Sequence, residues 1–118
     1  YTRYLADLFN QNVIREYTLN YYSNNKAKLS KMEFADYYKN FQVTEAMMAE
    51  VRALATKSGV KHNEKEYEIS KDYIRNNVKA YIARSIWGAK GFYHIYNETD
   101  EIYMKSLGLF GEAEKISE

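Results

Sequence analysis

Apolar residues recur along the chain at intervals of three and four positions, which is the spacing of one face of an α-helix. The first such segment covers residues 2–22, and its apolar positions are Leu5, Leu8, Phe9, Val13, Tyr17 and Tyr21. The polar run Ser-Asn-Asn at 23–25 follows it. Short polar side chains compete for backbone hydrogen bonds, so this run predicts the end of the first helix.

Two further helices are predicted before residue 60. Ser30 and Glu33 have the spacing of a capping box, ahead of an apolar segment at 34–41 that predicts a short helix. Thr44 is a suitable N-cap for a third helix, whose apolar face holds Met47, Met48, Val51, Leu54 and Ala55. Gly59 fits the left-handed position that ends such a helix.

The segment 64–87 has the most regular pattern. Asn63 and Glu66 form another capping box, and Ser70 offers a second start. We therefore predict a short helix at 64–69 and a long one at 71–87. The long one repeats an aliphatic residue at every fourth position, at Ile74, Val78, Ile82 and Ile86.

A chain reversal is predicted after the long helix. Gly88 and Gly91 both tolerate backbone conformations that other residues avoid. The large rings of Trp87, Phe92 and Tyr93 are expected to lock this reversal against the core. Arg84 is placed to reach the free carbonyls of the helix end or the acids Glu98 and Asp100.

The last part of the chain is expected to complete the core. Phe92 to Tyr96 predicts a helical turn, and Asn97 or Thr99 is a suitable cap for a last helix. Three apolar residues are expected to close the core, namely Leu107, Leu109 and Phe110. Residues 111–118 are polar and are predicted to form a frayed tail.

These patterns predict one all-α domain. No segment alternates apolar and polar residues for long enough to indicate a strand. The length of 118 residues favours a single domain, and the absence of proline permits long helices without forced kinks. We expect a small bundle of about five helices over residues 1–110.

Composition restricts the function classes. The net charge of +1 argues against non-specific binding to nucleic acid or to an anionic membrane. No cysteine is present, so disulfides and thiolate metal sites are excluded. The thirteen tyrosines predict a core with a rim of phenols, and they also suit a groove for a peptide or a sugar. Because the chain starts at Tyr1, we expect a piece of a longer or processed protein.

Few residues offer chemistry. A metal site would need His62, His94 and nearby carboxylates, and we expect neither a metal nor a cofactor. Ser23 and Lys26 have the S-x-x-K spacing of serine acyl-enzymes, but an Asn-rich loop suits a fixed dyad poorly. Tyr67 and Lys71 share a Y-x-x-x-K spacing without a glycine-rich phosphate loop. We assign no catalytic residue.

Residues 71–90 carry five positive charges and one negative. Lys71, Arg75 and Lys79 form a ladder at every fourth position, and Arg84 and Lys90 follow. Such a patch suits nucleic acid or an acidic partner. The alternative, which we prefer, is the solvated back of the helix whose front is the aliphatic stripe.

The most distinctive sequence is Val78–Gly88, followed by Gly91–Asp100 and by Ser106-Leu107. Its order of lysine, alanine, arginine, tryptophan and glycine resembles the extreme C-terminal region of C-terminal processing (tail-specific) serine peptidases of the Bacteroidota type. The opening of the chain and the aromatic segment 34–41 are also similar to parts of that region.

The resemblance implies a non-catalytic helical accessory domain of an exported peptidase. Such a domain would support substrate capture, assembly or active-site coverage, in the periplasm or cell envelope. Its partners would be the peptidase domain of the same parent chain and a peptide or protein substrate, with oligomers allowed. Two other hypotheses stay open: a free-standing helical interaction module, and a small enzyme that uses His94 with nearby carboxylates.

Overall fold

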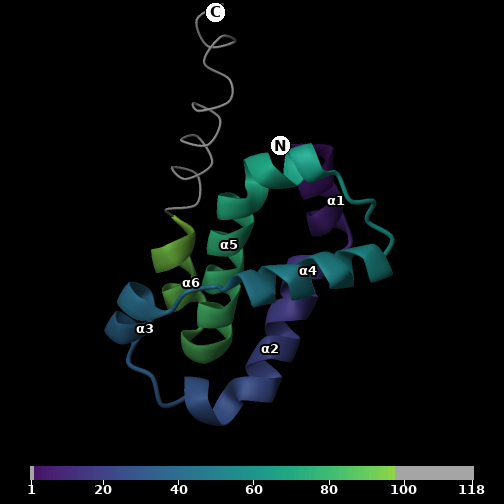
Figure 1. Ribbon diagram of the computed structural model, residues 1–118. Coiled ribbons are helices and arrows are strands. Elements are labelled where there is room, and N and C mark those ends of the chain that lie inside the picture. The colour runs from purple at the N-terminus through teal and green to yellow at the C-terminus, as the bar shows by residue number, and fades with distance from the viewer. Residues whose placement is uncertain (1, 98–118) are drawn as a thin grey trace, which may run out of the picture.

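The computed structural model describes residues 2–97, and helices are the only regular elements in that range (Figure 1). The described elements are α1 (Arg3–Asn10), α2 (Val13–Leu29), α3 (Phe34–Asn40), α4 (Glu45–Lys57), α5 (Glu64–Trp87) and α6 (Ala89–Tyr96). The predicted all-α bundle is confirmed. The expected last helix, with Leu107, Leu109 and Phe110, and the polar tail at 111–118 lie outside the described residues.

Helix α5 is the element around which the others are arranged. It packs against α1, α2 and α6, while α4 packs on α2 (Figure 1). Three members of its aliphatic stripe are buried as predicted, because Ile74, Val78 and Ile82 each have an exposed fraction of 0%. The fourth, Ile86, is only partly buried, so the predicted burial is wrong for that position. None of the helices in the described range is long and apolar enough to cross a membrane.

The single helix predicted at 2–22 is wrong, because α1 ends at Asn10 and α2 begins at Val13. Asn12 has φ 54° and ψ 32°, the left-handed conformation that asparagine tolerates better than most residues. Leu8 and Val13 are both fully buried, on either side of the break. The apolar spacing therefore continues across a break between two helices, and the pattern alone conceals it.

The end predicted at residues 23–25 is also wrong. Helix α2 continues to Leu29, which is buried. Asn25 leaves helical geometry, with φ −125° and ψ 19°, and its Nδ2 donates to the carbonyl oxygen of Tyr21 at 2.9 Å. The polar run therefore kinks the helix without ending it.

The capping box predicted at Ser30 does not form. Ser30 is the C-cap of α2, and Glu33 precedes α3 without a capping hydrogen bond from its side chain. Tertiary contacts hold α3 instead. The fully buried Tyr37 donates its hydroxyl to the carbonyl oxygen of Lys79 at 2.6 Å, and its ring stacks on Phe41 at 4.6 Å.

The other predicted helix ends of this part of the chain are confirmed. The side chain of Thr44 accepts from the backbone N–H of Met47 at 3.2 Å, and Asn63 accepts from that of Glu66 at 3.0 Å. Gly59 has φ 92°, and the N–H of Val60 returns to the carbonyl of Ala55 at 2.9 Å. This last bond belongs to the motif that closes many helix ends.

The division of 64–87 into two helices is wrong, because α5 is continuous. Ser70 does not start a helix. Its side chain is fully buried, and its Oγ lies 3.3 Å from Oγ1 of Thr2. One turn earlier, Glu66 accepts from the backbone N–H of Tyr4 at 2.8 Å. The first turns of α5 therefore anchor α1.

The tyrosines do not all lie at the predicted rim, since several belong to the core itself. Tyr4, Tyr37, Tyr67 and Tyr73 are each at most 5% exposed. Burial raises the pKa of Tyr4 to about 12, with a further contribution from Tyr67. Burial also raises the pKa of Tyr37. The folded state therefore favours neutral phenols.

Alkaline solution is expected to destabilise this domain. Phenols ionise near pH 10 in the unfolded chain, so the stabilisation from Tyr4 is complete below about pH 10. It is lost as the pH rises through that value towards the folded pKa of about 12. Denaturant unfolding at a series of pH values should show this loss, and Tyr4→Phe should make it smaller. Tyr93→Phe is the control, because Tyr93 is 56% exposed; an equal effect of both variants would contradict the assignment.

Candidate functional site

The turn between α5 and α6 consists of one residue. Gly88 has φ 80° and ψ −162°, and its N–H donates to the carbonyl of Arg84 at 2.9 Å. Gly91 then lies against α5, where a Cβ would meet Cβ of Trp87 at 3.0 Å and the ring of Phe34 at 3.6 Å. The predicted end of α5 is confirmed, and the second glycine allows α3, α5 and α6 to approach closely.

Two of the rings predicted to lock this corner, those of Phe92 and Tyr93, differ in how far they are exposed to solvent. Phe92 is 6% exposed and stacks on Tyr96 with ring centroids 4.9 Å apart, as a locking residue should. Tyr93 is 56% exposed, so its predicted part in the lock is wrong. Successive helical residues point about 100° apart, so Phe92 and Tyr93 cannot both face the core. Arg84 lies over the ring of Phe92, and the predicted contact with Glu98 or Asp100 falls outside the described residues.

A surface pocket of about 400 Å³ lies where α3, α5 and α6 meet. We call it the aromatic pocket, and its lining residues are Phe34, Trp87, Lys90, Gly91 and His94. The ring of Phe34 is nearly perpendicular to that of Trp87, at 85° and 5.1 Å. It is also nearly perpendicular to that of His94, at 86° and 5.1 Å. The pocket is therefore built from rings that brace one another.

The chemistry of the aromatic pocket favours an apolar occupant. Perpendicular rings also form the cages that bind quaternary ammonium groups. Here Lys90 is one of the lining residues, and its positive charge disfavours a second cation nearby. Among the described residues that line the pocket, none carries a carboxylate that would offset this charge. The arrangement suits an uncharged apolar side chain that has an acidic neighbour.

The two histidines lie in different places. His94 is in the aromatic pocket, where Tyr38 also contacts its ring at 5.0 Å. His62 packs edge-on against Tyr4 at 5.6 Å, and its Nε2 lies 3.2 Å from Oε1 of Glu64. Within residues 2–97, no group of three or more histidine and acidic side chains is placed to hold a metal ion.

The candidate dyads do not assemble in the described structure. Ser23 and Lys26 are both exposed on α2, and the kink at Asn25 lies between them. The hydroxyl of Tyr67 accepts from Nη1 of Arg52 at 2.5 Å. Nζ of Lys71 donates instead to Glu68 at 3.3 Å. Neither spacing therefore brings a nucleophile and a base together.

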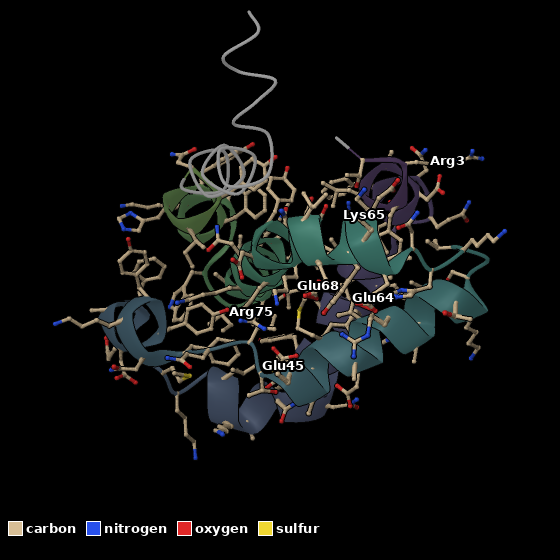
Figure 2. All side chains as sticks on the ribbon, turned by 45° about the horizontal axis from the view of Figure 1, so that its top comes forward. Arg3, Glu45, Glu64, Lys65, Glu68 and Arg75 are labelled. Atoms are coloured by element: carbon tan, nitrogen blue, oxygen red, sulfur yellow. The ribbon has the colours of Figure 1, made fainter. Side chains whose placement is uncertain are left out.

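The predicted basic ladder connects helices. Nη2 of Arg75 bonds Oε1 of Glu45, the first residue of α4, at 2.5 Å (Figure 2). Nζ of Lys79 donates to the carbonyl oxygen of Tyr38 at 2.7 Å, and it lies 5.9 Å from the ring centroid of Tyr37. The predicted solvated back is therefore wrong for Lys79, whereas the Arg75–Glu45 pair lies at the surface. Both residues nevertheless connect α5 to a neighbouring helix, Arg75 to α4 and Lys79 to α3.

Comparison with known proteins gives one match. A family model described as a family of unknown function, DUF8443, matches residues 4–88. That range includes Phe34 and Trp87 of the aromatic pocket, while Lys90, Gly91 and His94 follow it. No curated protein and no solved structure matches the chain.

Proposed function

The chain belongs to the DUF8443 family, and on this premise we propose that it is a non-catalytic domain that binds a polypeptide through the aromatic pocket. The observation that carries the proposal is an open apolar pocket with rigid aromatic walls. Exposed apolar surface is unfavourable in water, and partner proteins commonly anchor one large side chain in such a pocket.

The size of the pocket supports a peptide anchor. Its volume of about 400 Å³ lies near the lower end of the range for ligand sites, about 300–1,000 Å³. One aromatic or aliphatic side chain and its neighbours suit this volume better than a large cofactor does. Lys90 at the wall then favours an acidic residue beside the anchor.

The proposed partner follows from the resemblance of the 78–100 segment. Four pocket residues belong to that segment, namely Trp87, Lys90, Gly91 and His94. We propose that they contact the peptidase domain of the same parent chain, or its substrate, in an exported C-terminal processing peptidase. A free-standing interaction module that uses the same pocket is the second candidate, because the pocket does not depend on the identity of its occupant.

The binding proposal has a built-in probe, since Trp87 is the only tryptophan of the chain and lies in the pocket. A short acidic peptide with a central phenylalanine is expected to shift Trp87 fluorescence with saturation. The same peptide with alanine at the centre should not. His94→Ala should weaken binding roughly tenfold through loss of one wall.

His62→Ala is the matched control, because it removes an exposed histidine that lies outside the aromatic pocket. Equal weakening of binding by both histidine variants, or equal binding of both peptides, would contradict the proposal that the aromatic pocket is the binding site. The peptidase partner is tested separately, by the mass of the native protein that carries this domain. A cytoplasmic species near 14.0 kDa would favour the free-standing module.

A further inference from the structure

A second hollow, of about 200 Å³, lies between α2 and α5, away from the residues of the aromatic pocket. Its lining residues are Arg15, Thr18, Leu19, Tyr81, Arg84 and Ser85. Arg15 comes from α2 and Arg84 from α5, so the fold places two arginines that are far apart in sequence around one hollow. We call it the arginine hollow.

Neither guanidinium group of the arginine hollow has a carboxylate partner within residues 2–97. Arg84 contacts the ring of Phe92, 5.5 Å from its centroid, and the described part of the chain offers Arg15 no ion pair. Glu16 is the nearest acid in sequence to Arg15, and it does not line the arginine hollow, although both residues line a neighbouring hollow and form no ion pair with each other. Other cations do pair, as Arg75 does with Glu45. Of the described residues that line the arginine hollow, the two charged ones are therefore both arginines.

Two hydroxyl groups add to the donors of this hollow. The hydroxyl of Ser85 is held only weakly, with its Oγ 3.5 Å from the carbonyl oxygen of Tyr81. The phenol of Tyr81 makes no hydrogen bond to any described residue. Thr18 differs, because its proton is committed to the carbonyl of Arg15 at 3.0 Å. The two arginine side chains and these two hydroxyls thus form no ion pair, and no hydrogen bond shorter than 3.5 Å, with a described residue.

We propose that the arginine hollow binds a tetrahedral oxyanion of the phosphate class. A phosphate group carries a charge of about −1.5 to −2 at neutral pH, which matches two guanidinium groups better than one carboxylate does. Arginine also binds phosphate oxygens through paired N–H donors. The small volume admits the phosphate group itself, whether it is free or attached to a serine. This site uses no residue of the aromatic pocket, so it stands independently of the proposed function.

The test is an NMR titration of the 118-residue chain with inorganic phosphate, at constant ionic strength. Saturable shifts are expected at the amides of Thr18 and Ser85. Arg15→Gln and Arg84→Gln should each raise the Kd about tenfold or more, as loss of a charge-assisted hydrogen bond does. Arg3→Gln is the matched control, since Arg3 is an exposed arginine of α1 that does not line this hollow.

Titrations with other anions distinguish free phosphate from a phosphorylated residue and test for general ionic screening. Phosphoserine that binds more tightly than inorganic phosphate would support the site and point to a phosphorylated partner. Acetate or chloride with the same effect as phosphate would overturn the proposal, because it would show general screening. Equal Kd values for Arg15→Gln, Arg84→Gln and the parent would overturn it as well. If Arg84→Gln loses its helical circular dichroism, Arg84→Lys should fold and still bind more weakly, because it lacks the paired donors.

Discussion

Replacing Ile82 with alanine is expected to lower the free energy of unfolding by about 2–5 kcal/mol. Ile82 has an exposed fraction of 0%, and it follows Ile74 and Val78 on the buried face of α5. This helix packs against α1, α2 and α6, so a cavity there weakens several contacts at once. The loss combines the transfer of the missing methyl groups with the empty space that they leave.

Denaturant unfolding of Ile82→Ala should be compared with that of Asp72→Ala. Asp72 lies exposed on the same helix, so its loss should change stability by less than about 0.5 kcal/mol. Lys79 is unsuitable as a surface control, because its ammonium group bonds the carbonyl of Tyr38. Equal losses for Ile82→Ala and Asp72→Ala would mean that the buried face of α5 is assigned wrongly.

Local chemistry explains which parts of the fold the sequence predicts. Thr44 and Asn63 cap their helices through side-chain oxygens that bond N–H groups only three residues away. Gly59 closes α4 through its own positive φ. Each of these signals acts within one turn of helix, and each prediction is confirmed. The stripe on α5 is also a property of one helix and needs no partner to be recognised.

The errors arise where a distant contact overrides a local signal. Ser70 resembles a helix start, yet its hydroxyl meets Thr2 inside a continuous helix. Ser30 resembles a cap, but α3 is placed by the hydroxyl of Tyr37 on the backbone of Lys79. Neither bond has any signature in the residues beside it. Asn12 is different, since its left-handed conformation is a local event that the uninterrupted apolar spacing conceals.

The aromatic pocket and the arginine hollow also depend on contacts between helices that the sequence alone does not reveal. The sequence draws attention to Trp87, Gly91 and His94, but the wall of the aromatic pocket that Phe34 supplies comes from a separate helix. In the arginine hollow, Arg15 has no distinguishing neighbours in the sequence and meets Arg84 only through the packing of α2 on α5. A pocket between helices is a property of their packing, so residue patterns within one helix cannot predict it.

Gly88→Val is expected to lower the free energy of unfolding by about 1–3 kcal/mol, through backbone strain alone. With φ 80° and ψ −162°, Gly88 occupies a region that is essentially restricted to glycine. A Cβ at this position would meet no atom within 4 Å, so steric clash is not the cause.

Asparagine substitutions at Gly88 and Gly59 can distinguish the backbone strain expected at Gly88 from that at an ordinary helix end. Gly88→Asn should destabilise about as much as Gly88→Val, because asparagine tolerates the left-handed helical region but not the conformation of Gly88. Gly59→Asn should be milder, since Gly59 ends α4 in a motif that accepts asparagine. Thermal unfolding of the three variants measures the difference. A Gly88→Val variant that melts like the parent, yet no longer shifts Trp87 fluorescence with the phenylalanine peptide, would contradict this expectation. The turn before Lys90 and Gly91 would then act in binding, and the glycine would serve the aromatic pocket instead of the fold.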